Sequence, residues 1–77
     1  MITVLLFAQL QEEMGKERFE LEINELSVQD LKELIKQNYN LNQLDHVMVA
    51  INEEYALPSD IVSQGDVVAF IPPVSGG

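Results

Sequence analysis

The chain has 77 residues and a formal net charge of −9, with thirteen acidic residues against four basic ones. This length fits a single domain, and the acidic surplus repels phosphate backbones, so we expect no nucleic-acid partner. No apolar run is longer than that of residues 4–8, which is too short to span a membrane, and the first residues lack the basic region of a secretory signal. We therefore expect no membrane partner and a cytoplasmic location.

The residue types present exclude several kinds of site. The absence of cysteine excludes disulfides, thiolate metal sites and a cysteine nucleophile. The single histidine, His46, cannot by itself form a metal site or a catalytic triad, and we expect it at the surface or at a strand edge. The chain also lacks a Gly-x-x-x-x-Gly-Lys phosphate loop. We expect it to bind no metal or cofactor of its own.

The first part of the chain predicts two antiparallel strands. Residues 2–8 are almost continuously apolar, which indicates a strand. Residues 9–15 are mostly polar and end in a glycine, which is typical of a short helical turn. Residues 18–23 alternate strictly between polar and apolar types, so they predict a half-buried strand that pairs with the first.

A helix is predicted to begin at Ser27. Asp30 follows three residues later, as in an acidic variant of the capping box, and places negative charge in the first turn. The pattern ends at Asn38 or Tyr39. Apolar residues fall on one stripe of this helix: Val28, Leu31, Leu34 and Ile35. A single apolar stripe indicates that the helix packs on one neighbouring surface.

The second half predicts three more strands. Residues 46–51 form the third, residues 55–57 a short fourth, and residues 67–71 the last. Turn-forming residues separate them, and Pro72 ends the pairing of the last strand because it lacks an N–H donor.

The element order is therefore β-β-α-β-β-β, which predicts an α+β domain with one main helix across one face of a mixed sheet. This is the order of the β-grasp, or ubiquitin-like, fold, in which the first and last strands lie side by side at the centre of the sheet. We expect residues 1–71 to form this domain and residues 72–77 to form a flexible, extended tail.

The two central strands are apolar on both faces. Successive residues are apolar in the first strand, at 4–7, and in the last, at 67–71, whereas a sheet with one solvated face should alternate. Because one helix covers only one face, the other face is covered by loops or is open for a partner. We favour a partner, with Phe7, Tyr55 and Ile71 as candidate contacts. The alternative is that these three belong to the core.

The end of the sequence predicts an extended tail that is long enough to enter another protein. It reads Pro72-Pro73-Val74-Ser75-Gly76-Gly77. The prolines favour an extended backbone, and six extended residues span about 20 Å, enough to enter another protein's active site. Two glycines can thread a narrow slot and leave a reacting carboxyl group unshielded. The alternative is a frayed terminus without a chemical role.

Two segments carry a resemblance to a known family. Residues 65–77, with their Pro-Pro-Val-Ser-Gly-Gly ending, and residues 2–10 resemble the small subunit of molybdopterin synthase (the MoaD family), and length and element order agree over essentially the whole chain. The thiamine sulfur carriers (ThiS) share the fold and the Gly-Gly but usually lack the double proline. The MoaD family often has two aromatics where this chain has Phe70-Ile71, and an arginine where it has Gln11. These departures concern partner contacts.

The resemblance implies a sulfur carrier. A partner adenylating enzyme (MoeB-like) would join the Gly77 carboxylate to AMP, using ATP and magnesium, and sulfur would then displace AMP to give a thiocarboxylate. The tail would enter the large subunit of molybdopterin synthase (MoaE-like) and donate its sulfur to a pterin precursor. Gly76 would thread the slot, and Pro72, Pro73, Val74 and Ser75 would contact the partner. The chain would then be a sulfur-donor subunit, with the active site chiefly on the large subunit.

Other functions share these features. The carrier could supply another pathway, such as thiamine synthesis. It could be a ubiquitin-like protein modifier, with Gly77 joined to a lysine amine of a target. Finally, the chain could be an acidic interaction domain whose Gly-Gly is incidental.

Overall fold

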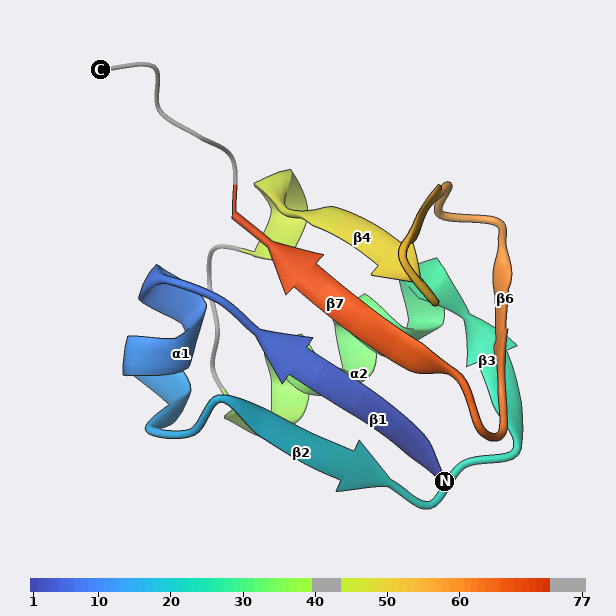
Figure 1. Ribbon diagram of the computed structural model, residues 1–77, viewed down its shortest axis with the longest axis horizontal. Helices are drawn as coiled ribbons and strands as arrows, with labels where there is room; N and C mark the ends of the chain where they lie inside the picture. The colour runs from blue at the N-terminus through green and yellow to red at the C-terminus, as the bar shows by residue number, and fades with distance from the viewer. Residues whose placement is uncertain (40–43, 73–77) are drawn as a thin grey trace.

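The structure, a computed structural model, describes residues 1–39 and 44–72. Within these ranges the chain forms one five-stranded sheet, one two-stranded sheet, two α-helices and a short 3₁₀ helix (Figure 1). The helical elements are α1 (Gln9–Met14), α2 (Val28–Tyr39) and η1 (Leu44–His46). The strands are β1 (Ile2–Leu6), β2 (Arg18–Leu21), β3 (Glu25–Ser27), β4 (Met48–Ile51), β5 (Glu54–Ala56), β6 (Ile61–Ser63) and β7 (Val67–Ile71). No helix in the described ranges is long and apolar enough to cross a membrane.

The five-stranded sheet has the predicted central pair. Its strand order is β2-β1-β7-β4-β5, and β1 and β7 run parallel, with Leu6 opposite Phe70. The other strand pairs of this sheet are antiparallel. The α+β β-grasp fold is therefore confirmed, as is the position of the first and last strands at the centre.

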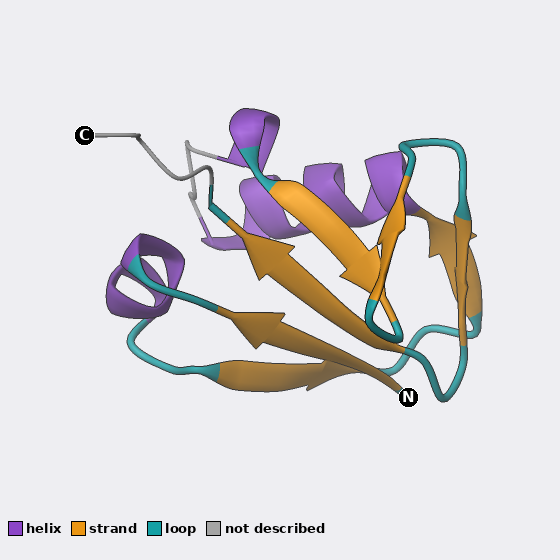
Figure 2. Cartoon of the chain, turned by 45° about the horizontal axis from the view of Figure 1, so that its top comes forward, coloured by secondary structure: helices purple, strands orange, loops and turns teal. Residues whose placement is uncertain are grey.

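Helix α2 covers one face of this sheet and closes the core. Figure 1 shows it crossing behind β1 and β7, and Figure 2 shows it along the same side of the sheet, behind β4. Its residues Val28, Leu31 and Ile35 are fully buried, and so is Phe70 of β7. Each such side chain contributes about 1.5–3 kcal/mol when it leaves water. The apolar stripe predicted from the sequence thus packs on the sheet. The core consists of Ile2, Val4, Leu6, Leu10, Val28, Leu31, Ile35, Leu44, Val47, Val49, Val62, Val68 and Phe70.

The beginning of α2 is capped from two parts of the chain. The Ser27 Oγ accepts a hydrogen bond from the Asp30 N–H at 3.1 Å, as an N-cap serine does. The N–H groups of Val28 and Gln29 donate to the carbonyls of Asp60 and Pro58, at 2.9 and 3.0 Å. These bonds satisfy the first amides of the helix, which have no partner within it. The predicted beginning of the helix is confirmed, and α2 ends at Tyr39.

Some strand limits differ from the prediction. β1 ends at Leu6 because the chain turns back at Ala8, where the Phe7 carbonyl accepts a hydrogen bond from the Leu10 N–H at 3.1 Å. The predicted third strand begins later, at Met48, since a 3₁₀ helix occupies the residues before it. His46 is the last residue of that helix and is exposed. The second strand ends at Leu21, and the short fourth strand is shifted by one residue, to Glu54–Ala56.

Two strands were not predicted at all. β3 and β6 pair antiparallel as a separate two-stranded sheet, with Leu26 opposite Val62. Each has only three residues, which is too short for a periodic pattern of side chains to reveal a strand. Their pairing joins residues far apart in the sequence, so it depends on the tertiary fold.

We predict that Ser27→Ala lowers the thermal midpoint of unfolding. The substitution removes the acceptor of the Asp30 N–H, a loss of about 1 kcal/mol, which corresponds to about 4–8 °C in a domain of this size. Circular dichroism melting measures the change. Ser59→Ala, in an exposed turn, is the matched control and should shift the midpoint by less than half as much. Equal melting of the Ser27 variant and the wild-type chain would contradict the capping role.

Candidate functional site

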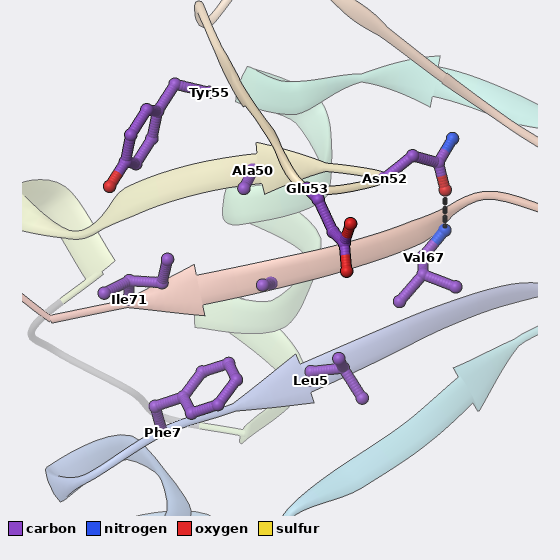
Figure 3. Close-up of a pocket in the computed structure, with 9 residues that line it drawn as sticks. Leu5, Phe7, Ala50, Asn52, Glu53, Tyr55, Val67 and Ile71 are labelled. Carbon is purple, nitrogen blue, oxygen red and sulfur yellow. Dashed lines mark hydrogen bonds between the residues drawn. The ribbon is translucent and has the colours of Figure 1, made fainter.

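The face of the sheet opposite α2 carries a shallow hollow of about 600 Å³ (Figure 3). We call this surface the open face. Nine residues line it: Leu5, Phe7, Ala50, Asn52, Glu53, Tyr55, Val67, Ala69 and Ile71. They come from the two central strands, from Phe7 directly after β1, from β4, and from the β4–β5 hairpin. The lining is mainly apolar, which is unusual for a sheet face without a covering layer.

The open face follows from the alternation of side chains along the central strands. Val4 and Leu6 are buried on the side of α2, whereas Leu5 and Phe7 line the hollow on the opposite side, as the alternation of side chains along a strand requires. In β7, Val68 and Phe70 are buried while their neighbours line the hollow. The second apolar set inferred from the sequence is therefore present and faces solvent.

The three predicted contact residues share this surface. Phe7 is 44% exposed and Tyr55 is 71% exposed, and Ile71 is partly buried. Figure 3 shows Phe7 and Ile71 side by side at the end where β1 and β7 stop, with Tyr55 at the same end. Phe7 and Tyr55 are thus surface residues and not core. Their contact with a partner stays a prediction.

A strained turn fixes the position of Phe7. Ala8 has φ 51° and ψ −122°, a conformation that L-residues rarely adopt and that costs about 1–3 kcal/mol. On one side of this turn the Leu6 N–H donates to the Glu17 carbonyl at 2.9 Å. On the other side Leu10 is buried. The backbone around Phe7 is therefore held at both ends.

A polar clip ties the β4–β5 hairpin to the beginning of β7. The Asn52 side chain donates from Nδ2 to Asp66 Oδ1 and accepts at Oδ1 from the Val67 N–H, both at 3.0 Å. The Asn52 N–H also donates to the Val67 carbonyl at 2.8 Å. Asp66 Oδ2 in turn accepts from the Ser63 N–H at 2.8 Å. The clip was not predicted from the sequence. Asn52 and Asp66 are turn-type residues, but the bonds that Asn52 forms with Asp66 and Val67 join residues 14 and 15 positions apart, which the local pattern does not reveal.

These bonds hold the pKa of the Asp66 carboxyl below its ordinary value. The larger cause is the hydrogen bond from the Ser63 backbone N–H, and the second is the bond from the Asn52 amide. Partial burial acts in the opposite direction. Donors directed at the charged carboxylate stabilise it relative to the neutral acid.

The open face reaches the beginning of the predicted tail. Ile71 lines the hollow, pairs with Met48 and is the last residue of β7. Pro72 follows it and is partly buried. The remaining tail residues predicted to act lie outside the described residues: Pro73, Val74, Ser75, Gly76 and Gly77. Within residues 1–39 and 44–72, no group of three or more histidine, aspartate and glutamate side chains could hold a metal ion.

Comparison with known proteins identifies the family. The model of the ThiS family matches residues 4–77. The chain belongs to the ThiS family. One relative is the molybdopterin synthase sulfur carrier subunit of Arabidopsis thaliana. The chain is 39% identical to it, over 99% of this chain and 82% of that protein. It is 33% identical to the protein of the same name from Haemophilus influenzae, over the whole length of both. The resemblance inferred from the two ends of the sequence is confirmed.

Solved structures share the fold. A putative molybdopterin converting factor subunit 1 from Pyrococcus furiosus is 30% identical with a TM-score of 0.80, over 95% of this chain and 97% of that chain. SAMP1 from Haloferax volcanii is 26% identical with a TM-score of 0.84, over 99% of this chain and 98% of that chain. Subunit 1 of the Helicobacter pylori molybdopterin-converting factor was solved in complex with subunit 2. It has a TM-score of 0.70 at 23% identity, over 99% of this chain and 97% of that chain. At that identity the likeness concerns the fold alone.

We predict that Asp66→Asn destabilises the domain in a pH-dependent way. The folded-state pKa of Asp66 is depressed, so its stabilising contribution is fully present above the unfolded-state pKa of about 3.9 and is lost as pH falls through the folded-state value. The variant should have a lower free energy of unfolding than wild type at neutral pH, and the gap should narrow below about pH 4. Urea unfolding at a series of pH values measures both.

Glu54→Gln is the matched control, because it removes one carboxylate of the same hairpin outside the clip. Its difference from wild type should stay small at every pH. A gap for Asp66→Asn that widens on acidification would contradict the assignment.

Proposed function

We propose that this chain is the sulfur carrier subunit of a molybdopterin synthase, acting in molybdenum cofactor biosynthesis in the cytoplasm. The observation that carries the proposal is the 33–39% identity, over essentially the whole chain, to two proteins that bear this name. The family match also extends to residue 77, so it includes the Gly-Gly that the sequence singled out.

In this proposal Gly77 is the carrier group. A free carboxylate is a poor electrophile, so a partner adenylating enzyme joins it to AMP with ATP and magnesium, and pyrophosphate leaves. A sulfide-level nucleophile, hydrosulfide, then attacks the acyl carbon and displaces AMP, which leaves a thiocarboxylate on Gly77. In the synthase this sulfur passes to the pterin precursor, and water supplies the oxygen that regenerates the Gly77 carboxylate. Gly76 and Gly77 bring no side chain into a narrow site.

The domain gives the tail a fixed starting point beside its docking surface. Ile71 belongs both to the open face and to the last position of β7, so a partner that covers the open face lies next to the tail. The proposed partner is the large subunit of the synthase. The Helicobacter pylori protein, solved with its subunit 2, gives a precedent in a protein of the same fold. The adenylating enzyme is the second proposed partner.

A second candidate is a ubiquitin-like protein modifier. The likeness to SAMP1, with a TM-score of 0.84 at 26% identity, favours it, since another SAMP1 structure of the same organism is described as a small archaeal modifier protein. Both candidates require activation of Gly77. They differ in the final acceptor, which is a pterin precursor for the carrier and a lysine amine for the modifier.

We predict that the length of the tail is critical for activity. Deleting Gly77, or adding one alanine after it, should abolish sulfur transfer to the pterin precursor, because a displacement of about 1 Å at a reacting centre already costs about a hundredfold in rate. Circular dichroism and thermal melting should match wild type, since residue 77 lies beyond the last strand. The assay is molybdopterin formation by the complex reconstituted with activating enzyme, sulfur source and large subunit. Wild-type activity of the deletion would refute the proposed role of Gly77.

We predict that Tyr55→Asp weakens binding to the large subunit, whereas Leu57→Asp does not. The two side chains are exposed to a similar extent, at 71% and 67%, but only Tyr55 lines the open face. A charge placed in an apolar contact should weaken affinity by about tenfold or more. Titration calorimetry gives the two dissociation constants. Equal weakening by both variants would contradict docking on the open face.

A further inference from the structure

The β4–β5 hairpin has a glutamate where its turn favours glycine. Residues 52 and 53 form a two-residue loop between the paired residues Ile51 and Glu54. Both loop residues have positive φ, 51° at Asn52 and 71° at Glu53, as in a type I′ turn, for which Asn-Gly is the preferred sequence. Asn52 fits this preference, but Glu53 holds a left-handed conformation that costs free energy for a residue with a Cβ atom.

The side chain of Glu53 lies over the open face. Figure 3 shows it extending from the hairpin over β7, between Val67 and Ile71 and nearer to Val67. It is the one charged side chain among the nine that line the hollow. Within residues 1–39 and 44–72 its carboxylate has no hydrogen-bond or ion-pair partner. The turn thus holds an unpaired negative charge above an apolar surface.

Covering this surface would remove the carboxylate from water. An ionised group that is desolvated without a partner is strongly unfavourable, so a purely apolar partner surface would be rejected. A cationic side chain at this point would instead form an ion pair, strengthened by the low polarity of its surroundings. The net charge of −9 also favours approach of a partner with a basic surface.

We infer that Glu53 is a specificity-determining residue of the open face, and that the docking partner presents one lysine or arginine side chain to it from within an apolar patch. The inference rests on the proposed function, because the occupant is the large subunit of the synthase. Glu53 lies over β7 between Val67 and Ile71, and Ile71 is the last residue before the tail segment begins at Pro72. A partner that pairs with Glu53 while accepting the tail must therefore cover the face from Glu53 to Ile71, which constrains its orientation on the sheet.

The test compares Glu53→Gln with Glu54→Gln in calorimetric titrations of the full-length chain with the large subunit of the same organism at low salt. The two substitutions remove the same charge at adjacent positions, but Glu54 does not line the open face. We expect Glu53→Gln to weaken binding about 30-fold or more, and Glu54→Gln to change it less than about threefold. The salt dependence of binding should also be smaller for Glu53→Gln than for wild type.

Glu53→Gly separates the effect of residue 53 on stability from its effect on binding to the large subunit. Glycine relieves the positive-φ strain, partly offset by the greater freedom of the unfolded chain, so the thermal midpoint should rise by about 2–6 °C. Binding to the large subunit should nevertheless weaken as in Glu53→Gln. Higher stability with lower affinity cannot result from partial unfolding.

The possible failures are distinct. If wild type binds the large subunit and Glu53→Gln binds equally well, Glu53 is only a solvated turn residue, and this inference is wrong while the proposed function stands. If wild type does not bind the large subunit, the proposed function and the inference are both wrong. Equal weakening by Glu53→Gln and Glu54→Gln indicates general charge attraction and overturns the specific ion pair.

Discussion

The parallel pairing of β1 with β7 is the constraint on which the rest of the structure depends. It places two strands with apolar residues on both faces at the centre of the sheet. One face, which includes Val4 and Phe70, is buried under α2, and the other becomes the open face. Because the strands are parallel, both stop at the same edge, so Phe7 and Ile71 meet where the tail begins (Figure 3). The open face and Ile71, the last residue before the tail segment, are thus placed together by one strand pair.

Backbone strain is concentrated at this surface. Within the described residues, the three positions other than glycine with positive φ are Ala8, Asn52 and Glu53. Ala8 directly follows Phe7, and the other two line the hollow. Strain of this kind persists where surrounding bonds enforce it and is often found at functional sites. Here the enforcing bonds are those of the Ala8 turn and of the clip between Asn52 and Asp66. The strained positions are therefore held by hydrogen bonds next to the surface that we propose to be bound.

The sequence predicted those features that depend on local pattern. The last strand has its predicted limits, Val67–Ile71, and α2 begins after Ser27 as its capping pattern indicated. The open face could be predicted because the central strands are apolar on both faces, and a single helix covers only one face of a sheet. The β3–β6 pair and the Asn52–Asp66 clip could not, since each joins residues distant in sequence through contacts that only the tertiary fold creates. The importance of Glu53 also emerged only from its backbone conformation and its place on the open face.

In the proposed function this domain carries a reactive terminus, and Gly77 accepts sulfur. Intact-mass spectrometry tests this most directly. The wild-type chain would be incubated with the adenylating enzyme, ATP, magnesium and a sulfur source, and its C-terminal peptide would then be sequenced by fragmentation. The account predicts a mass change equal to the replacement of one oxygen by sulfur, located on Gly77. An unchanged mass, or an adduct joining Gly77 to a lysine of a target protein in place of the sulfur, would contradict it.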